Sequence, residues 1–133
     1  MTRVHLPDDL RARILGEARS PRECCGLLEG TSDGDTFHVL ALHAVENLAG
    51  PADRFEMNPR DQIAAQKAAR ARGRAVVGCY HSHPGGRAEP SAVDLAGAGE
   101  ENFLWLIAAG EYLSAFVYSG GEFLSADWVT SSE

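Results

Sequence analysis

The chain has a shortage of positive charge. The sequence has 12 lysine and arginine residues and 19 aspartate and glutamate residues, which gives a formal net charge of −7. Because binding to phosphates requires a basic face, this balance argues against DNA, RNA or an anionic membrane as the main partner. An acidic surface suits solubility and does not by itself identify a substrate.

Cysteines and long apolar runs are also scarce. The three cysteines are Cys24, Cys25 and Cys79. Adjacent cysteines rarely bridge each other and an odd total leaves one over, so we interpret them as small buried residues in a reducing compartment. The sequence shows no N-terminal apolar leader and no apolar run of membrane-spanning length. We therefore expect a cytoplasmic protein.

The length and composition predict one α/β domain over residues 1–133. A hydrophobic fraction of 44% is sufficient for a core at this length, and the sequence contains no repeats, linkers or low-complexity tracts. Apolar periodicity and turn residues predict one mixed sheet with helices packed against it. The expected helices cover 6–20, 60–72 and a segment starting at 91; the expected strands cover 25–28, 36–45, 54–57, 75–81, 103–108, 113–118 and 122–129, with a turn at 30–34.

Two histidines separated by one residue follow the predicted strand at 75–80. Alternate side chains of a strand point the same way, so His81 and His83 can reach one metal ion. Asp94 adds a carboxylate thirteen residues after His81. Two histidines and one carboxylate, with a fourth position left for water, form the pattern of a catalytic zinc site. Cys79 shares a face with His81, and we interpret it as a buried strand residue.

Ser91 and Asp94 also permit a purely structural interpretation. Ser-x-x-Asp after a proline and before apolar residues has the pattern of a helix capping box. Ser91 can cap a helix and still face a site. For Asp94 the two interpretations compete, because a carboxylate bonded to its own cap is less available to a metal.

A catalytic zinc site also requires a group that moves protons. Glutamates are the candidates, and position along the chain does not choose among Glu23, Glu29, Glu46, Glu56 and Glu89.

Taken together, these residues resemble the motif of the JAMM/MPN+ (Mov34/JAB1-like) metalloprotease family. The pattern is Glu23, then His81-x-His83, seven residues, Ser91, two residues and Asp94. The segments 21–30, 54–56 and 77–84 are similar to the short stand-alone prokaryotic members, and the resemblance covers roughly residues 4 to 128.

The resemblance implies a cytidine-deaminase-like α/β fold and a role for each motif residue. His81, His83 and Asp94 would bind one Zn²⁺, Glu23 would act as general base and then general acid, and Ser91 would help to hold the oxyanion. The zinc-dependent deaminases of this fold carry a Pro-Cys-x-x-Cys signature after the histidine. This sequence lacks it, so base deamination is disfavoured.

The resemblance further implies a peptidase or isopeptidase that cuts after the C-terminal glycine of a ubiquitin-like protein. For the short prokaryotic group, the expected partner is a ThiS/MoaD-like sulfur carrier with a Gly-Gly tail, and the loops at 46–58 and 85–90 would form the walls of its groove. Two alternatives stay open, namely a zinc amidohydrolase acting on a small molecule and a non-catalytic binding module. A relative associated with DNA repair is disfavoured by the acidic charge.

Overall fold

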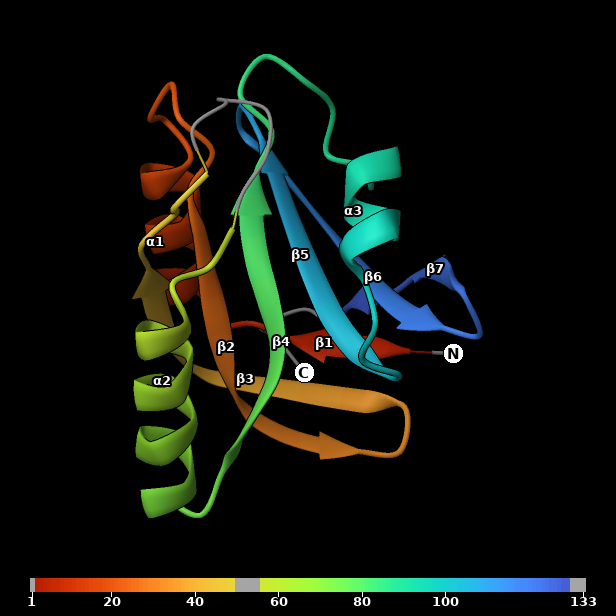
Figure 1. The fold of residues 1–133 in the computed structure, drawn as a ribbon. Coiled ribbons are helices and arrows are strands. Elements are labelled where there is room, and N and C mark those ends of the chain that lie inside the picture. The colour runs from red at the N-terminus through yellow and green to blue at the C-terminus, as the bar shows by residue number, and fades with distance from the viewer. Residues whose placement is uncertain (1, 50–55, 130–133) are drawn as a thin grey trace.

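The computed structural model describes residues 2–49 and 56–129. Within them, eight strands form one mixed sheet in the order β7-β6-β5-β4-β2-β3-β1-β8 (Figure 1). The helices are α1 (Asp8–Glu17), α2 (Pro59–Ala71) and α3 (Ala92–Gly97); the strands are β1 (Arg3–His5), β2 (Cys25–Asp33), β3 (Thr36–Val45), β4 (Ala75–Ser82), β5 (Phe103–Ala109), β6 (Tyr112–Ser119), β7 (Glu122–Ser125) and β8 (Asp127–Trp128). The predicted mixed α/β fold with helices against one sheet is confirmed.

The two faces of the sheet carry separate apolar clusters. On one face, Leu10 and Ile14 of α1 pack against residues that include Leu28, Phe37 and Leu106. On the other face, where α2 and α3 lie (Figure 1), Ala65 of α2 packs with a smaller cluster made of Cys25, Leu27, Val45, Cys79 and Trp105. None of the helices in the described part of the chain is long and apolar enough to cross a membrane.

The central strands β2 and β4 run antiparallel, and their pairing sets the geometry of the candidate site. Cys25 lies opposite His81 in this pairing. Gly26 leaves room for the buried Tyr80 ring, which a Cβ at residue 26 would overlap. The segment just before β2 is therefore held beside the end of β4.

Two local predictions differ from the structure. The turn expected at 30–34 lies later, around Gly34 and Asp35, because β2 continues to Asp33. Gly30 is a strand residue, placed where a Cβ would overlap the His38 carbonyl. The first helix ends at Glu17, three residues before its expected end, and the chain continues in turns to Ser20.

The edges of the sheet also differ from prediction. The strand expected at 122–129 is divided at Ala126 into β7, which pairs with β6, and β8, which pairs in parallel with the unpredicted β1. Since only Ala126 separates strands at opposite ends of the strand order, the sheet curls enough to bring the end of β7 close to the start of β8. Of the strand expected at 54–57, residues 54 and 55 lie outside the described residues, and Met57 forms an isolated bridge with Asn47.

Candidate active site

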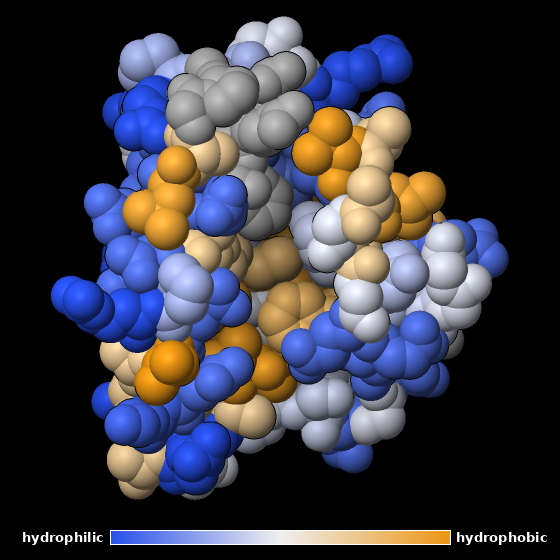
Figure 2. Space-filling model, in the orientation of Figure 1, coloured by the Kyte–Doolittle hydropathy of each residue, from blue (hydrophilic) through white to orange (hydrophobic). Residues whose placement is uncertain are grey.

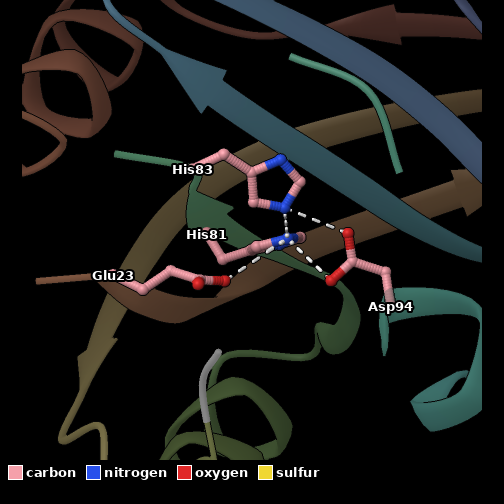
Figure 3. A group of neighbouring side chains, drawn as sticks. All are labelled: Glu23, His81, His83 and Asp94. Atoms are coloured by element: carbon pink, nitrogen blue, oxygen red, sulfur yellow. Dashed lines mark hydrogen bonds and ion pairs between the residues drawn. The ribbon is translucent and has the colours of Figure 1, made fainter. Parts of the chain in front are cut away.

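Four of the predicted site residues converge at the end of β4 (Figure 3). Glu23 precedes β2, and His81 is the last residue but one of β4, which ends at Ser82. His83 directly follows β4, and Asp94 lies in the first turn of α3. One ligand atom from each of the four lies within 4.8 Å of the other three. Residues up to 71 positions apart in the sequence thus form one compact group of two imidazoles and two carboxylates.

The distances within this group suit a single small cation. The Nε2 atoms of His81 and His83 are 3.0 Å apart. Asp94 lies 3.1 Å from each of them, through Oδ1 to His81 and Oδ2 to His83. Ligand atoms of a tetrahedral zinc ion stand about 2.0 Å from the metal and hence about 3.3 Å from one another. The nitrogen and oxygen donors present therefore fit a zinc ion with only small adjustments.

The two histidines are fixed by different neighbours. The Nδ1 atom of His83 donates a hydrogen bond to the Arg87 carbonyl oxygen at 2.8 Å, so in the neutral ring the lone pair is on Nε2, which faces Asp94. His81 is fully buried and meets Trp105 edge to face, with ring centroids 5.6 Å apart. Both rings thus present Nε2 toward the same point.

The surroundings of His81 and Asp94 favour the protonation states in which these side chains bind a metal: a neutral imidazole and an ionised carboxylate. Burial lowers the pKa of His81 and so favours its neutral ring. Burial acts to raise the pKa of Asp94, but hydrogen bonds from His81 and His83 outweigh it and hold that pKa below its usual range. The hydrogen bond to Asp94 raises the pKa of His83. A cation at this site would therefore compete with a proton for His83.

Ser91 and Asp94 satisfy both interpretations of their spacing. The Ser91 Oγ accepts the Asp94 N–H at 3.0 Å and the Asp94 Oδ2 accepts the Ser91 N–H at 2.9 Å, which makes a complete capping box. The same carboxylate faces both histidines. Capping therefore orients Asp94 toward the group instead of withdrawing it.

The structure separates the five candidate glutamates. In the described part of the chain, Glu23 is the one that joins the histidines, with its Oε1 3.9 Å from His81 Nε2 and its side chain only 2% exposed. Glu29 is buried in an ion-pair network, Glu46 and Glu56 are exposed, and Glu89 is exposed at the mouth of the site.

Beside this group lies an open cavity of about 400 Å³. Its lining includes Glu23, His83, Arg87, Glu89 and Ser91, so the loop at 85–90 forms one wall. Figure 2 shows that the face between α2 and α3 is hollowed and has an apolar floor. A further cavity of about 270 Å³ on this face is lined by residues that include Leu27, Gln62, Val76 and Phe103.

The second wall expected from the sequence, the loop at 46–58, is only partly described. Glu46 and Asn47 line a neighbouring cavity of about 300 Å³ on the other side of Glu23. The middle of the predicted 46–58 wall, residues 50–55, lies outside the described residues.

The cysteines behave as small buried residues. Cys25 and Cys79 are buried and Cys24 is half-buried, all as free thiols. Burial raises the pKa of Cys25 to about 12, which removes it as a nucleophile near neutral pH.

Two residues that support the backbone of the site, Ser82 and Asn47, are not predicted from the sequence. The Ser82 hydroxyl accepts the Cys24 N–H at 2.9 Å, and the Asn47 amide group donates to the Glu23 carbonyl oxygen at 2.8 Å. Both act on backbone atoms of segments far away in the sequence, so spacing along the chain carries no signal for them.

Comparisons with known proteins agree with the motif. The family model described as prokaryotic homologues of the JAB domain matches residues 7–119. A desampylase of Haloferax volcanii is 37% identical over 113 residues, or 80% of each chain. A desampylase of Pyrococcus furiosus is 33% identical over 98 residues, covering 74% of this chain and 67% of its own.

A solved structure supports the same assignment. The solution structure of a protein from Desulfitobacterium hafniense is 30% identical and superposes with a TM-score of 0.86, covering 95% of this chain and 91% of that one. The match over most of the chain and the convergence of the motif residues lead to one conclusion: the chain belongs to the prokaryotic JAB-domain family, the JAMM/MPN+ group that its sequence resembles.

Proposed function

We propose that this JAMM-type hydrolase is a zinc-dependent peptidase or isopeptidase that cuts after the C-terminal glycine of a ubiquitin-like protein. The observation that carries the proposal is the convergence of Glu23, His81, His83 and Asp94 beside an open cavity. The relatives named desampylases support it, since that name denotes removal of ubiquitin-like small archaeal modifiers.

The donor set suits one zinc ion per chain, held by His81, His83 and Asp94. When bound there, zinc would supply Lewis acidity that activates a water molecule and polarises the scissile carbonyl. The second carboxylate, Glu23, lies further from His81 Nε2, at 3.9 Å, than Asp94 does at 3.1 Å. This difference supports Asp94 as the ligand and Glu23 as the proton carrier.

Glu23 and Ser91 supply the remaining chemistry. Oε1 of Glu23 takes a proton from the attacking water and delivers it to the leaving amine, which needs no covalent bond to the enzyme. The Ser91 Oγ accepts its capping bond from the Asp94 N–H, so its own proton is available to the cavity. That hydroxyl donates to the scissile carbonyl oxygen as negative charge develops on it.

The surface around the site suits a thin, extended chain end. The face between α2 and α3 is hollowed and has an apolar floor (Figure 2), and the cavity lined in part by Leu27, Val76 and Phe103 lies on this face. A tail that ends in glycines has no side chains to collide with the walls near Glu23 and His83. These features support a ThiS/MoaD-like carrier with a Gly-Gly tail as the partner.

A small-molecule amide is the second candidate substrate. The cavity of about 400 Å³ beside His83 is within the size range of small-ligand sites. The same water, glutamate and serine would hydrolyse a small amide. The two candidates differ in whether a protein tail is required for turnover.

The test compares matched substrates on the zinc-loaded protein. A carrier with a short peptide after its Gly-Gly, the free tail peptide and small N-acyl amino acids are incubated separately and followed by mass spectrometry. Cleavage of the carrier at a rate at least tenfold above the peptide and the amides supports the proposal. Equal or faster cleavage of the small amides would transfer the assignment to an amidohydrolase.

A further inference from the structure

We propose that Asn47 is a positioning residue for Glu23, and that its amide group fixes the backbone from which the proton carrier projects. The inference rests on the proposed function for its kinetic part. Asn47 lies 24 positions from Glu23 in the sequence, in the segment that follows β3.

Within the described residues, the Asn47 side chain hydrogen-bonds to three backbone groups. Its Nδ2 donates to the Glu23 carbonyl oxygen at 2.8 Å. Its Oδ1 accepts the N–H groups of Ala49 and Glu56, each at 2.9 Å. One side chain therefore joins the two ends of the segment between residues 49 and 56 to the residue that carries the proposed base.

Glu23 depends on such contacts because it lies outside regular structure. The strand β2 starts two residues later, at Cys25. Between Glu23 and β2, Cys24 makes two hydrogen bonds with Ser82. The Cys24 N–H donates to the Ser82 Oγ at 2.9 Å, and the Ser82 N–H donates to the Cys24 carbonyl oxygen at 3.1 Å. Ser82 stands between the two histidines, so it ties the Glu23 segment to the strand that carries them.

Asn47 holds the other end of the same peptide group, because the Glu23 carbonyl and the Cys24 N–H belong to one peptide unit. Asn47 and the Ser82 hydroxyl therefore fix this unit from both ends, and the Ser82 N–H fixes the next one through the Cys24 carbonyl oxygen. The Glu23 side chain extends from this fixed backbone and places its Oε1 3.9 Å from His81 Nε2. Only 2% of the side chain is exposed. A small rotation of the Glu23 peptide would move its carboxylate by a large fraction of that distance.

Other hydrogen bonds also hold the described residues around Asn47. The Arg22 guanidinium donates to the carbonyl oxygens of Asn47 and Ala49, at 3.2 and 2.7 Å. Backbone bonds also join Leu48 to Glu56 and Asn58 to Glu46. Loss of the amide group should therefore release Glu23 without unfolding the chain.

The amide group is the chemically specific feature. Nδ2 faces a carbonyl oxygen, which requires a donor, and Oδ1 faces two N–H groups, which require an acceptor. Aspartate in place of asparagine keeps the acceptor and the shape but cannot donate to Glu23. Alanine removes both functions and adds no charge.

The experiment compares Asn47→Asp and Asn47→Ala with the wild-type protein, using zinc-loaded enzyme and the carrier with a short extension after Gly-Gly. We expect kcat to fall about 10- to 100-fold in both variants, with KM and zinc content unchanged. The matched control is Glu101→Ala, in the turn before β5 and away from the site. It removes a carboxylate that accepts hydrogen bonds from the Gly120 N–H and the Ser119 hydroxyl. Its kcat should stay within twofold.

If Asn47→Asp keeps wild-type kcat while Asn47→Ala loses it, the acceptor that closes the segment matters and the proposed link to Glu23 is wrong. Wild-type kcat in both variants would overturn the proposal outright. A drop in zinc content in step with kcat would also contradict it, since the effect would then lie in metal binding.

A second readout needs no substrate and separates this inference from the proposed function. Hydrogen exchange at the Cys24 amide, which bonds to Ser82, should quicken at least tenfold in both Asn47 variants, while amides within β4 stay protected. Unchanged exchange at Cys24 would show that Asn47 does not hold this segment. If the wild-type protein cleaves no carrier, the proposed function fails while the exchange result still decides whether Asn47 anchors the Glu23 segment.

Discussion

Glu23 Oε1 lies 3.9 Å from His81 Nε2, although Glu23 precedes β2 and His81 lies on β4, 58 positions away in the sequence. The antiparallel pairing that sets Cys25 opposite His81 produces this approach. A buried carboxylate beside two imidazoles has the position required of a group that moves protons at a metal site.

Replacing this carboxylate with an amide should separate chemistry from metal binding. Glu23→Gln keeps the shape but cannot take up a proton, so we expect hydrolysis to fall about 10²- to 10⁴-fold. Zinc content, measured by elemental analysis after gel filtration, should stay at one ion per chain. Near-full activity in this variant would remove Glu23 from the mechanism.

Removing a proposed ligand should have a different signature. His83→Ala leaves an incomplete donor set, so we expect the loss of both zinc and activity. The matched control is His38→Ala, because His38 stacks on His5, outside the group of potential metal ligands. Loss of activity with full zinc content in His83→Ala would contradict the assignment of His83 as a ligand.

The ion pairs of Glu29 should make the free energy of unfolding depend on pH. The Arg72 hydrogen bonds lower the pKa of this buried carboxyl from 4.5 to about 2, with further bonds from His43 and Arg74. A depressed folded-state pKa contributes stability above pH 4.5, and that contribution is lost as the pH falls through about 2. Since the Arg72 side chain is half exposed, we expect roughly 2 kcal/mol after allowance for solvent screening.

Urea unfolding of wild type and Glu29→Gln at several pH values checks this expectation. Chelator is present throughout, so that metal loss does not contribute. The variant should be less stable at pH 7, and the gap should narrow toward pH 2. A gap that stays constant with pH would show that the Glu29 charge is not the source.

Two glycine substitutions should change stability in opposite directions. A Cβ at residue 26 would overlap the buried Tyr80 ring, so Gly26→Ala should destabilise the fold by about 1–3 kcal/mol. Gly16 is exposed in α1 with nothing within 4 Å of an added Cβ, so Gly16→Ala should stabilise by up to about 1 kcal/mol. Thermal unfolding of both variants measures the signs; equal shifts would refute the close packing of Gly26 on Tyr80.

The sequence predicts the fold class and the principal strands because their apolar patterns are strong and local. It misplaces the first hairpin, since Gly30 and Gly34 are both turn-forming residues and only the pairing with β3 shows which one turns. The three-residue β1 has too little pattern to be detected, and the break at Ala126 that separates β8 from β7 has no local signal. Both β1 and β8 form by pairing with strands distant in the sequence.

The site residues likewise divide into those with a signal in the sequence and those without one. The spacing of His81 and His83 predicts convergence from strand geometry, and Asp94 follows as a third candidate ligand from its chemistry. The family motif selects Glu23 among the glutamates and gives Ser91 its role. The capping role of Asp94 and its approach to the histidines turn out to be compatible, which the sequence alone left open. Asn47 has no local signature, because it acts through the backbone of a residue that is distant in the sequence.

The most direct test of the central claim is the intact mass of a ThiS/MoaD-like carrier, extended by a short peptide after its Gly-Gly, after incubation with the zinc-loaded protein in the presence and absence of a chelator. We predict trimming to the terminal glycine without chelator and none with it. With zinc confirmed bound, an untrimmed carrier across several such proteins would contradict the assignment of this chain as a peptidase for ubiquitin-like tails.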